Sequence, residues 1–227
     1  MTQQSVKLSK DTLEVLKMMA TINGSMAFKA GNKLRTLSPG GGSIFAEVEI
    51  AEEFPIPFSI YELGKFLGVL NLATMKDATL LFEDDKKVVI KGSGSTKINY
   101  YFTSDSFVTA PDKELVLPSV ELDVTLTADV IDGFMRAASA LGHKIMALTV
   151  REGNAYLVAT NPDQGDASND YEVDLGPVEA ADAVYKLKIE NIKLLTGDYR
   201  VQVCARGMVG FLNDERKLKV FIGLEMA

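Results

Sequence analysis

The feature that most constrains this chain is a helix start that occurs twice. The first copy, Leu8 to Ala20, is LSKDTLEVLKMMA, and the second, Leu126 to Leu141, is LTADVIDGFMRAASAL. At an offset of 118 residues, counted from Leu8 to Leu126, the copies also pair Ser9 with Thr127, Asp11 with Asp129 and Leu13 with Ile131. In both copies a hydroxyl can cap the first N–H groups, and a carboxylate lies where the helix dipole favours negative charge. A repeat about half a chain apart predicts a duplicated domain.

Length and charge fit that interpretation. The 227 residues suffice for two domains of about 110 residues each, a common size. The formal net charge of −7 argues against a generally basic nucleic-acid binder, although a basic face on an acidic surface remains compatible with it. The one cysteine, Cys204, excludes an intramolecular disulfide and is expected to be buried on an alternating strand. The N-terminus carries no apolar signal region and no run is long enough to span a membrane, so we expect an intracellular soluble protein.

Hydrophobic periodicity predicts four helices among many short strands. We expect the helices at about Lys10–Ile22, Ser59–Leu70, Ala128–Leu141 and Glu190–Leu195. The second begins with an apparent capping box, Ser59 to Glu62, and the fourth repeats its Glu-x-x-Lys pattern at an offset of 128 residues, counted from Glu62 to Glu190. A polar loop is predicted over Asn161–Asn169.

The order strand, helix, three strands thus occurs four times. It predicts an α+β fold of two similar domains, each a pair of β-α-β-β-β units with antiparallel sheets outside and helices on one face. We place the domains at 1–103 and 120–227, with a connector over 104–119 that contains two prolines.

Catalytic and metal-binding patterns are missing from the sequence. His143 is the only histidine, and we expect it to be a dipole partner at a helix end or a surface residue. The loops at Gly40 and Gly94 lack the Gly-Lys-Ser/Thr sequence of a phosphate-binding loop. We therefore predict no enzyme activity, no cofactor and no metal; a hydrolase or transferase with an unrecognised site is the alternative.

Basic residues recur on the polar faces of the predicted helices: Lys10, Lys17, Lys65, Arg136 and Lys193. Acidic residues share those faces, namely Glu14, Glu62, Asp132 and Glu190. Ordinary amphipathic helices with mixed charge also explain this pattern, and on the residues alone that interpretation is better than a binding surface.

Several segments in order resemble the sliding clamps of DNA replication, and among these the clamps of T-even bacteriophages. They are KLSKDTLEVLKMMATIN at Lys7–Asn23, IYELGKFLGVL at Ile60–Leu70, LTVREGNAYLVATN at Leu148–Asn161 and TGDYRVQVCARG at Thr196–Gly207. The resemblance extends over nearly the whole chain, and its strength lies in the collinear order. The chain departs from those relatives in a few extra residues before Lys7 and in an earlier end after Leu224.

The resemblance implies a DNA clamp fold and a homotrimeric ring that encircles double-stranded DNA without reading its sequence. The five basic residues would face the DNA, and the ring would tether the replicative DNA polymerase after loading by an ATP-dependent clamp loader. It implies a location in the cytoplasm, that of the bacterial host if a phage encodes the chain. A non-enzymatic scaffold that binds peptides without encircling DNA is the alternative.

The resemblance also implies two protein-binding surfaces. Neighbouring subunits would join through the strands Lys97–Thr103 and Tyr171–Leu175, with Tyr101, Tyr171 and Val173 as candidate contacts. Partner proteins would insert apolar tails into a groove formed by Leu37, Val116, Leu117, Pro118 and Leu224. For each surface, ordinary packing within the chain is the competing explanation.

Overall fold

The chain folds into two compact units, Met1–Glu114 and Leu115–Ala227. The computed structural model describes residues 4–111, 113–161 and 169–225, so most of the polar loop predicted over Asn161–Asn169 lies outside the described residues. The division between the units falls inside the predicted connector. In the described part of the chain, no helix is long and apolar enough to cross a membrane.

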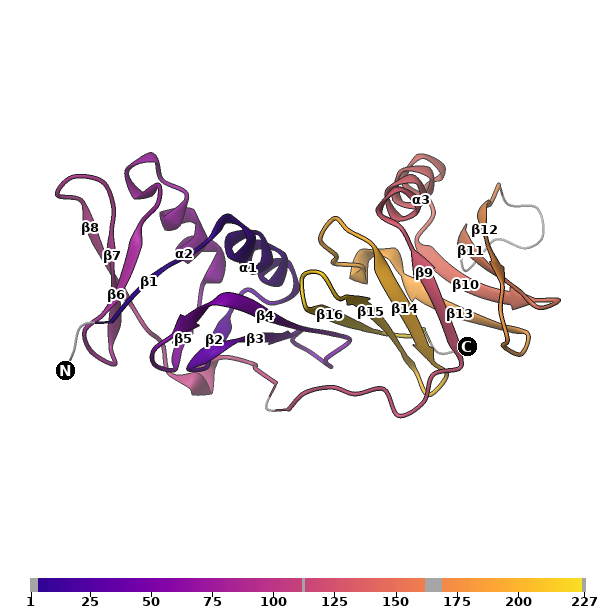
Figure 1. Ribbon diagram of the computed structural model, residues 1–227, viewed down its shortest axis with the longest axis horizontal. Coiled ribbons are helices and arrows are strands. Elements are labelled where there is room, and N and C mark those ends of the chain that lie inside the picture. Colours follow the sequence, from indigo (N-terminus) through magenta and orange to yellow (C-terminus); the bar gives the residue numbers. More distant parts are fainter. Residues whose placement is uncertain (1–3, 112, 162–168, 226–227) are drawn as a thin grey trace. The chain divides into compact units, whose positions relative to one another are not determined.

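Each unit contains two successive runs of one strand, one helical segment and three strands (Figure 1). The first unit consists of β1 (Gln4–Lys7), α1 (Lys10–Ile22), β2 (Met26–Phe28), β3 (Gly31–Leu37), β4 (Ile44–Phe54), β5 (Phe58–Ile60), α2 (Leu63–Leu70), the 3-10 turn η1 (Ala73–Met75), β6 (Thr79–Phe82), β7 (Lys87–Lys91), β8 (Lys97–Tyr101) and η2 (Asp105–Phe107). The second consists of β9 (Leu122–Leu126), α3 (Ala128–Leu141), β10 (Ile145–Arg151), β11 (Asn154–Thr160), β12 (Tyr171–Pro177), β13 (Ala183–Lys188), η3 (Ile189–Asn191), β14 (Tyr199–Cys204), β15 (Met208–Asn213) and β16 (Leu218–Gly223). The predicted fourfold order is confirmed.

The strands of each unit pair in antiparallel fashion. In the first unit they form the sheet β1-β6-β7-β8 and the pairs β2-β5 and β3-β4. In the second they form β9-β14-β15-β16 and β12-β11-β10-β13. The helices of each unit pack on the strands of that unit, and α1 and α2 also pack against each other. Antiparallel sheets with helices on one face are the fold class that the sequence predicts.

A cluster of phenylalanine rings forms much of the first core. The rings of Phe28 and Phe58 stack at a centroid distance of 4.4 Å, and Phe54 meets Phe28 edge-on at 5.1 Å. Phe102 stacks on Phe58 at 4.9 Å, so the chain just after β8 is fixed to the same core. Such pairs contribute about 0.5–1.5 kcal/mol each beyond the burial of their area.

The capping box predicted at Ser59 is wrong. Ser59 lies in β5 and is buried, and its hydroxyl donates to Asp105 Oδ1 at 2.6 Å. Pairing of β5 with β2 places Phe58 in the aromatic cluster, and this tertiary contact overrides the local helix signal. Helix α2 consequently begins at Leu63, with Glu62 as an N-cap whose side chain accepts no capping hydrogen bond.

Asn23 fastens the near end of the predicted connector to the first unit. Its buried side-chain amide donates to the carbonyls of Leu37 and Thr109, both at 3.0 Å, while its Oδ1 accepts from the Ser25 N–H at 2.9 Å. One side chain thereby joins the end of α1, the end of β3 and the segment after η2. Residues up to Thr109 therefore belong to the framework of the first unit.

The glycines of the turn after β7 differ sharply in their surroundings. A Cβ on Gly92 would lie 2.0 Å from the carbonyl oxygen of Thr74, which also accepts the Ser93 N–H at 2.8 Å. Gly94, two residues later, has a φ of +61° and open space around it. Close packing requires the first glycine, whereas the turn conformation only favours glycine at the second.

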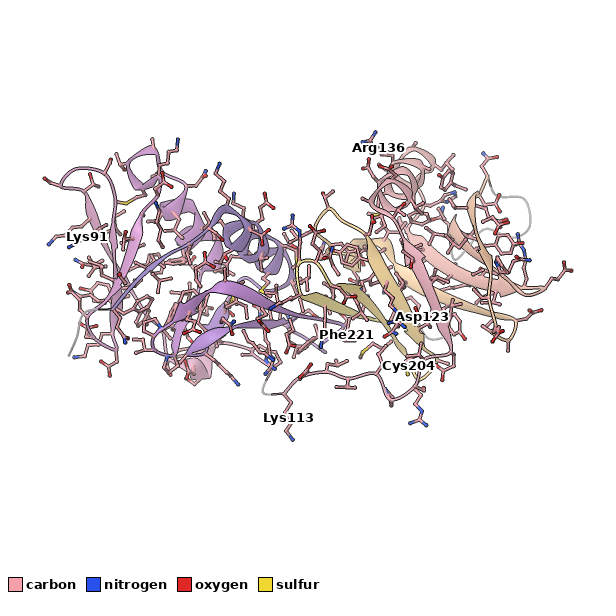
Figure 2. All side chains as sticks on the ribbon, viewed as in Figure 1. Lys91, Lys113, Asp123, Arg136, Cys204 and Phe221 are labelled. Atoms are coloured by element: carbon pink, nitrogen blue, oxygen red, sulfur yellow. The ribbon has the colours of Figure 1, made fainter. Side chains whose placement is uncertain are left out.

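The second unit contains a long, regular hairpin. Strands β10 and β11 pair from Ile145↔Thr160 to Arg151↔Asn154 across a two-residue turn. Both turn residues, Glu152 and Gly153, have positive φ angles, the conformation that matches the twist of the flanking strands. Cys204 is buried at the end of β14, as the sequence predicts (Figure 2).

The fourth predicted helix, Glu190–Leu195, is wrong. Only the 3-10 turn η3 forms, over Ile189–Asn191; Ile192 is extended, and residues 193–195 have no regular secondary structure. The Tyr199 hydroxyl donates to the Leu195 carbonyl at 2.9 Å, and buried Ile192 anchors the segment. So short a helix gains too few backbone hydrogen bonds to offset its nucleation cost, and the chain forms these tertiary contacts instead.

Candidate nucleic-acid interface

Helix α1 presents two lysines to solvent from a firmly packed helix. The Ser9 hydroxyl accepts the Thr12 N–H at 3.1 Å, which confirms the predicted cap. The helix buries the side chains Thr12, Val15, Leu16, Met18, Met19 and Ile22. Lys10 and Lys17 are exposed and, being seven residues apart, they project from the same face.

A carboxylate from β4 holds the start of α1. Glu52 accepts from the Ser9 N–H and, at 2.6 Å, from the Thr12 hydroxyl. Burial alone would raise the pKa of Glu52, but the hydrogen bonds from Thr12 and Ser9 outweigh it and lower the pKa below its usual 4.5. The helix start that carries Lys10 is thus fixed by an ionised side chain.

Two further lysines join these at a hollow of about 650 Å³ between α1 and the segment after α2. Lys7, Lys10, Lys17 and Lys76 line it, and Lys7 pairs with Asp77 at 3.6 Å. Lys7 and Lys76 were not among the predicted basic residues, because neither lies on a helix. The only local signal was the position of Lys7 directly before the repeated segment.

The remaining predicted cations have different surroundings. Lys65 on α2 is exposed and pairs with Glu62 at 2.7 Å, and this hydrogen bond raises the pKa of Lys65. Arg136 projects from α3 away from the strands and pairs with Asp132 at 2.6 Å (Figure 2). Lys193 follows η3 and is half-buried, so its predicted place on a helix is wrong. That these side chains face DNA stays a prediction.

Helix α3 repeats the construction of α1 at its start. The Thr127 hydroxyl accepts the Val130 N–H at 3.3 Å, and Asp198 accepts the Ala128 N–H at 2.7 Å, as Glu52 does for α1. Only Phe134 and Ala138 of this helix are fully buried. The repeated start is therefore preserved in the structure, whereas the burial of the two helices differs.

The strands that were predicted to join subunits lie at sheet edges. β8 ends the sheet β1-β6-β7-β8, and β12 ends the sheet β12-β11-β10-β13. Tyr101 on β8 is 67% exposed. Tyr171 packs edge-on against Phe134 at 6.3 Å, and Val173 is half-buried, so both already contribute to packing within their own unit. The subunit contacts stay a prediction.

The residues proposed for a peptide groove have individual roles within their own units. Leu37 ends β3 and packs near Gly42, and Leu117 lies over Gly210 of β15. Val116 is 75% exposed, Pro118 is exposed, and the N–H of half-buried Leu224 donates to Gly207 at 2.9 Å. Val116 is the clearest candidate for a partner contact, and the groove as a whole stays a prediction.

The surface position considered for His143 is wrong. The ring is buried, and its Nε2 forms a hydrogen bond with the Asn169 carbonyl at 2.5 Å. The backbone N–H of His143 donates to the Ala138 carbonyl at the end of α3. His143 thus closes the helix end. The alternative role at that end, as a dipole partner, agrees with this position.

Comparison with known proteins supplies the family. A family model described as DNA polymerase processivity factor matches residues 9–106. The sliding clamp of Vibrio phage KVP40 is 31% identical over 97% of this chain and 99% of its own length, and that of Enterobacteria phage T4 is 29% identical over 90% of each.

Solved structures show the same fold at low identity. The PCNA of A. fulgidus, described as bound to the C-terminal region of FEN-1, superposes with a TM-score of 0.74 at 12% identity, covering 98% of both chains. The length and identity of the phage matches decide the family, and the structural match supports the fold. The chain belongs to the sliding clamps, the processivity factors of DNA polymerases.

Proposed function

We propose that three copies of this chain close into a ring around duplex DNA and hold a replicative polymerase on its template. The observation that carries this proposal is the surface of the first unit beside α1, where four lysines, Lys7, Lys10, Lys17 and Lys76, line one hollow and outnumber its two carboxylates, Glu14 and Asp77. A ring with such surfaces inside attracts phosphates of any sequence, because phosphate contacts carry no base information. The net charge of −7 discourages DNA from binding elsewhere on the surface.

The edge strands support ring closure. Among the described residues, β8 and β12 each have one side without a partner strand in their own sheet. Pairing of β8 of one copy with β12 of the next extends both sheets and covers edges that otherwise invite aggregation. Three such contacts close a homotrimer.

The partners follow from that role. The polymerase binds through a short apolar tail near Val116, and an ATP-dependent loader opens the ring around DNA. The chain itself catalyses no reaction, and it works in the cytoplasm of the bacterial host. A scaffold that does not encircle DNA is not favoured by the matches to sliding clamps.

The ring is tested by topology. Loaded on a nicked circular duplex with a clamp loader and ATP, the protein should remain bound during gel filtration, and it should be lost once the circle is cut. Sedimentation of the pure protein should give three times the chain mass. Equal retention on circular and linear DNA would contradict encirclement.

The DNA-facing helices are tested by charge reversal. Lys17→Glu with Arg136→Glu should leave the fold intact, because exposed substitutions usually change stability by only about 0.5 kcal/mol. It should sharply reduce processive synthesis at low salt, and added salt should restore part of it by screening the new repulsion. Lys113→Glu, in the connector, is the control. Parental processivity of the double variant at low salt would contradict the assignment.

The interface is tested at Tyr101 rather than Tyr171, because Tyr171 also packs on Phe134. Tyr101→Asp places a charge on an exposed edge position and should convert trimers into monomers that melt at the parental temperature. Persistence of the trimer would remove β8 from the interface.

A further inference from the structure

The first two strands after the helix pair with each other in the second unit but not in the first, although β2 and β3 still pack against each other. In the second unit, β10 and β11 meet at the tight turn Glu152-Gly153. The corresponding strands of the first unit, β2 and β3, are not paired with each other, and β3 starts with an irregular register between Gly31 and Lys33. A hollow of about 340 Å³ lies beside β2 and β3.

The hollow is basic and has an apolar floor. Lys29, Lys33 and Arg35 line it, together with Gly31, Asn32 and the small apolar residues Ala27, Ala30, Ala110 and Pro111. None of the described residues that line it is acidic. Glu47 and Glu49 on β4 are the cross-strand partners of Arg35 and Lys33, but neither contributes to the lining.

The arginine is held in place before any ligand arrives. Arg35 Nε donates to Glu47, and both side chains are largely buried, at 20% and 7% exposure. The buried carboxylate holds one edge of the guanidinium in place. A ligand therefore loses less binding free energy to ordering the arginine side chain. The hollow therefore combines one positioned cation with two exposed lysines.

A second hollow borders the same stretch of the connector. Tyr61 and Phe107, 60% and 67% exposed, supply its aromatic side chains. The rest of the lining is mixed and includes the Glu62–Lys65 ion pair, Pro39 and Thr109. Thr109 belongs to this aromatic hollow and its neighbour Ala110 belongs to the basic one. The Asn23 amide donates to the Thr109 carbonyl at 3.0 Å, so the segment that contributes to both hollows is anchored.

We propose that the basic hollow is a docking site for an acidic segment of a partner peptide, whose aromatic or apolar residue occupies the neighbouring hollow. The two exposed lysines match carboxylates by charge, since Glu47 already offsets the charge of Arg35. Exposed aromatic side chains are typical anchors of protein interfaces. Residues 107–111 thus carry a second partner site, separate from the groove proposed around Val116.

The aromatic hollow favours a peptide over nucleic acid. A duplex backbone offers phosphates to the lysines but has no apolar side chain to place against Phe107. A peptide satisfies both hollows with neighbouring residues. This inference rests on the proposed function only in expecting partner proteins to bind through short segments.

The experiment uses the full-length protein and a short fluorescein-labelled peptide with a glutamate cluster at one end and phenylalanine at the other. Lys29→Gln with Lys33→Gln should weaken binding about tenfold at low salt, since exposed charge pairs are individually modest. Phe107→Ser should weaken it severalfold. Arg35 is left unchanged because removing one partner of a buried pair would disturb the fold.

The matched control removes the same charge elsewhere in the unit. Lys86→Gln with Lys91→Gln, both exposed and outside the hollow, should leave peptide binding unchanged. A peptide with glutamine in place of glutamate should bind the parent no better than it binds the Lys29/Lys33 variant. Equal loss in both double variants, or parental affinity in the first, would overturn the proposal.

A charge exchange gives the sharper test. Lys29→Glu with Lys33→Glu should reject the acidic peptide and bind the same peptide carrying lysines instead. If a short DNA duplex, rather than the peptide, loses binding in the glutamine variant, the ligand is nucleic acid and the proposal fails. Retention on circular DNA measured in parallel separates this failure from failure of the ring.

Discussion

The helices of the two units begin alike and are held differently. α1 and α3 share a hydroxyl cap and a distant carboxylate, Glu52 or Asp198, on their first N–H groups. Yet α1 buries six side chains and packs beside α2, whereas α3 buries two, and only the turn η3 stands at the matching place in its unit. The comparison teaches that a cap fixes where a helix starts, while tertiary packing determines how firmly it is held.

Removing the anchor of α3 should give the largest effect. Phe134 is fully buried, and Phe134→Ala should cost about 3–5 kcal/mol of unfolding free energy, because both transfer energy and a cavity are involved. Hydrogen exchange should show the amides of α3 losing protection before the rest of the second unit.

Leu16→Ala is the counterpart in α1 and should cost about 2–5 kcal/mol. Because other buried residues still hold α1, its amides should lose protection together with the surrounding unit. If α3 in the Phe134 variant also opened only with its whole unit, the two helices would be equally well anchored.

The next effect concerns charge. Lys17→Gln should reduce processive synthesis at low salt severalfold, because Lys17 belongs to the group of lysines around the α1 hollow. Arg136→Gln should reduce it less than about twofold, since Asp132 at 2.6 Å already offsets that charge. Primer-extension length measured across a salt series checks this; equal losses would mean that both units contact DNA equally.

The capping carboxylates should give a smaller effect. Glu52→Gln and Asp198→Asn should each cost about 0.5–2 kcal/mol of unfolding free energy in urea titrations. The folded state holds Glu52 ionised more strongly than the unfolded state does, so its contribution is present above its usual pKa of 4.5 and is lost as pH falls through the lowered pKa. The Glu52 variant should therefore lose less stability than the parent on acidification. A parallel decline of the two would contradict this linkage.

The smallest effect is expected at high pH. Burial raises the pKa of Tyr199 from 10 to about 12, so the folded state retains a proton that the unfolded state loses. Stability from this group is complete below pH 10 and is lost as pH rises towards 12. Tyr199→Phe should cost about 0.5–1.5 kcal/mol at neutral pH and flatten the alkaline decline seen in thermal melts. An unchanged alkaline slope would show that Tyr199 does not cause it.

Local signals account for the elements that the sequence predicts well. α1 and α3 have the predicted bounds because caps, dipole and apolar spacing all agree. The resemblance implied that Tyr101 lies at a sheet edge. The collinear order of the segments predicted the family and the fold.

Long-range contacts explain what could not be predicted. Ser59 has a helix-capping pattern, but strand pairing and the aromatic cluster draw it into β5. The segment after Glu190 has a helical pattern, but it is held by Ile192 and Tyr199. The basic hollow forms where β2 and β3 meet the segment at Ala110, which no local pattern of Lys29 or Lys33 indicates.

The two glycines after β7 should have different histories among descendants of this chain. At Gly94, where only the backbone angle matters, asparagine or aspartate can replace glycine at small cost, so drift is allowed. At Gly92 even one added carbon would meet a carbonyl oxygen that belongs to another segment. A substitution of Gly92 is tolerated only if the segment at Thr74 also shifts. Purifying selection should therefore keep Gly92 nearly invariant while Gly94 varies.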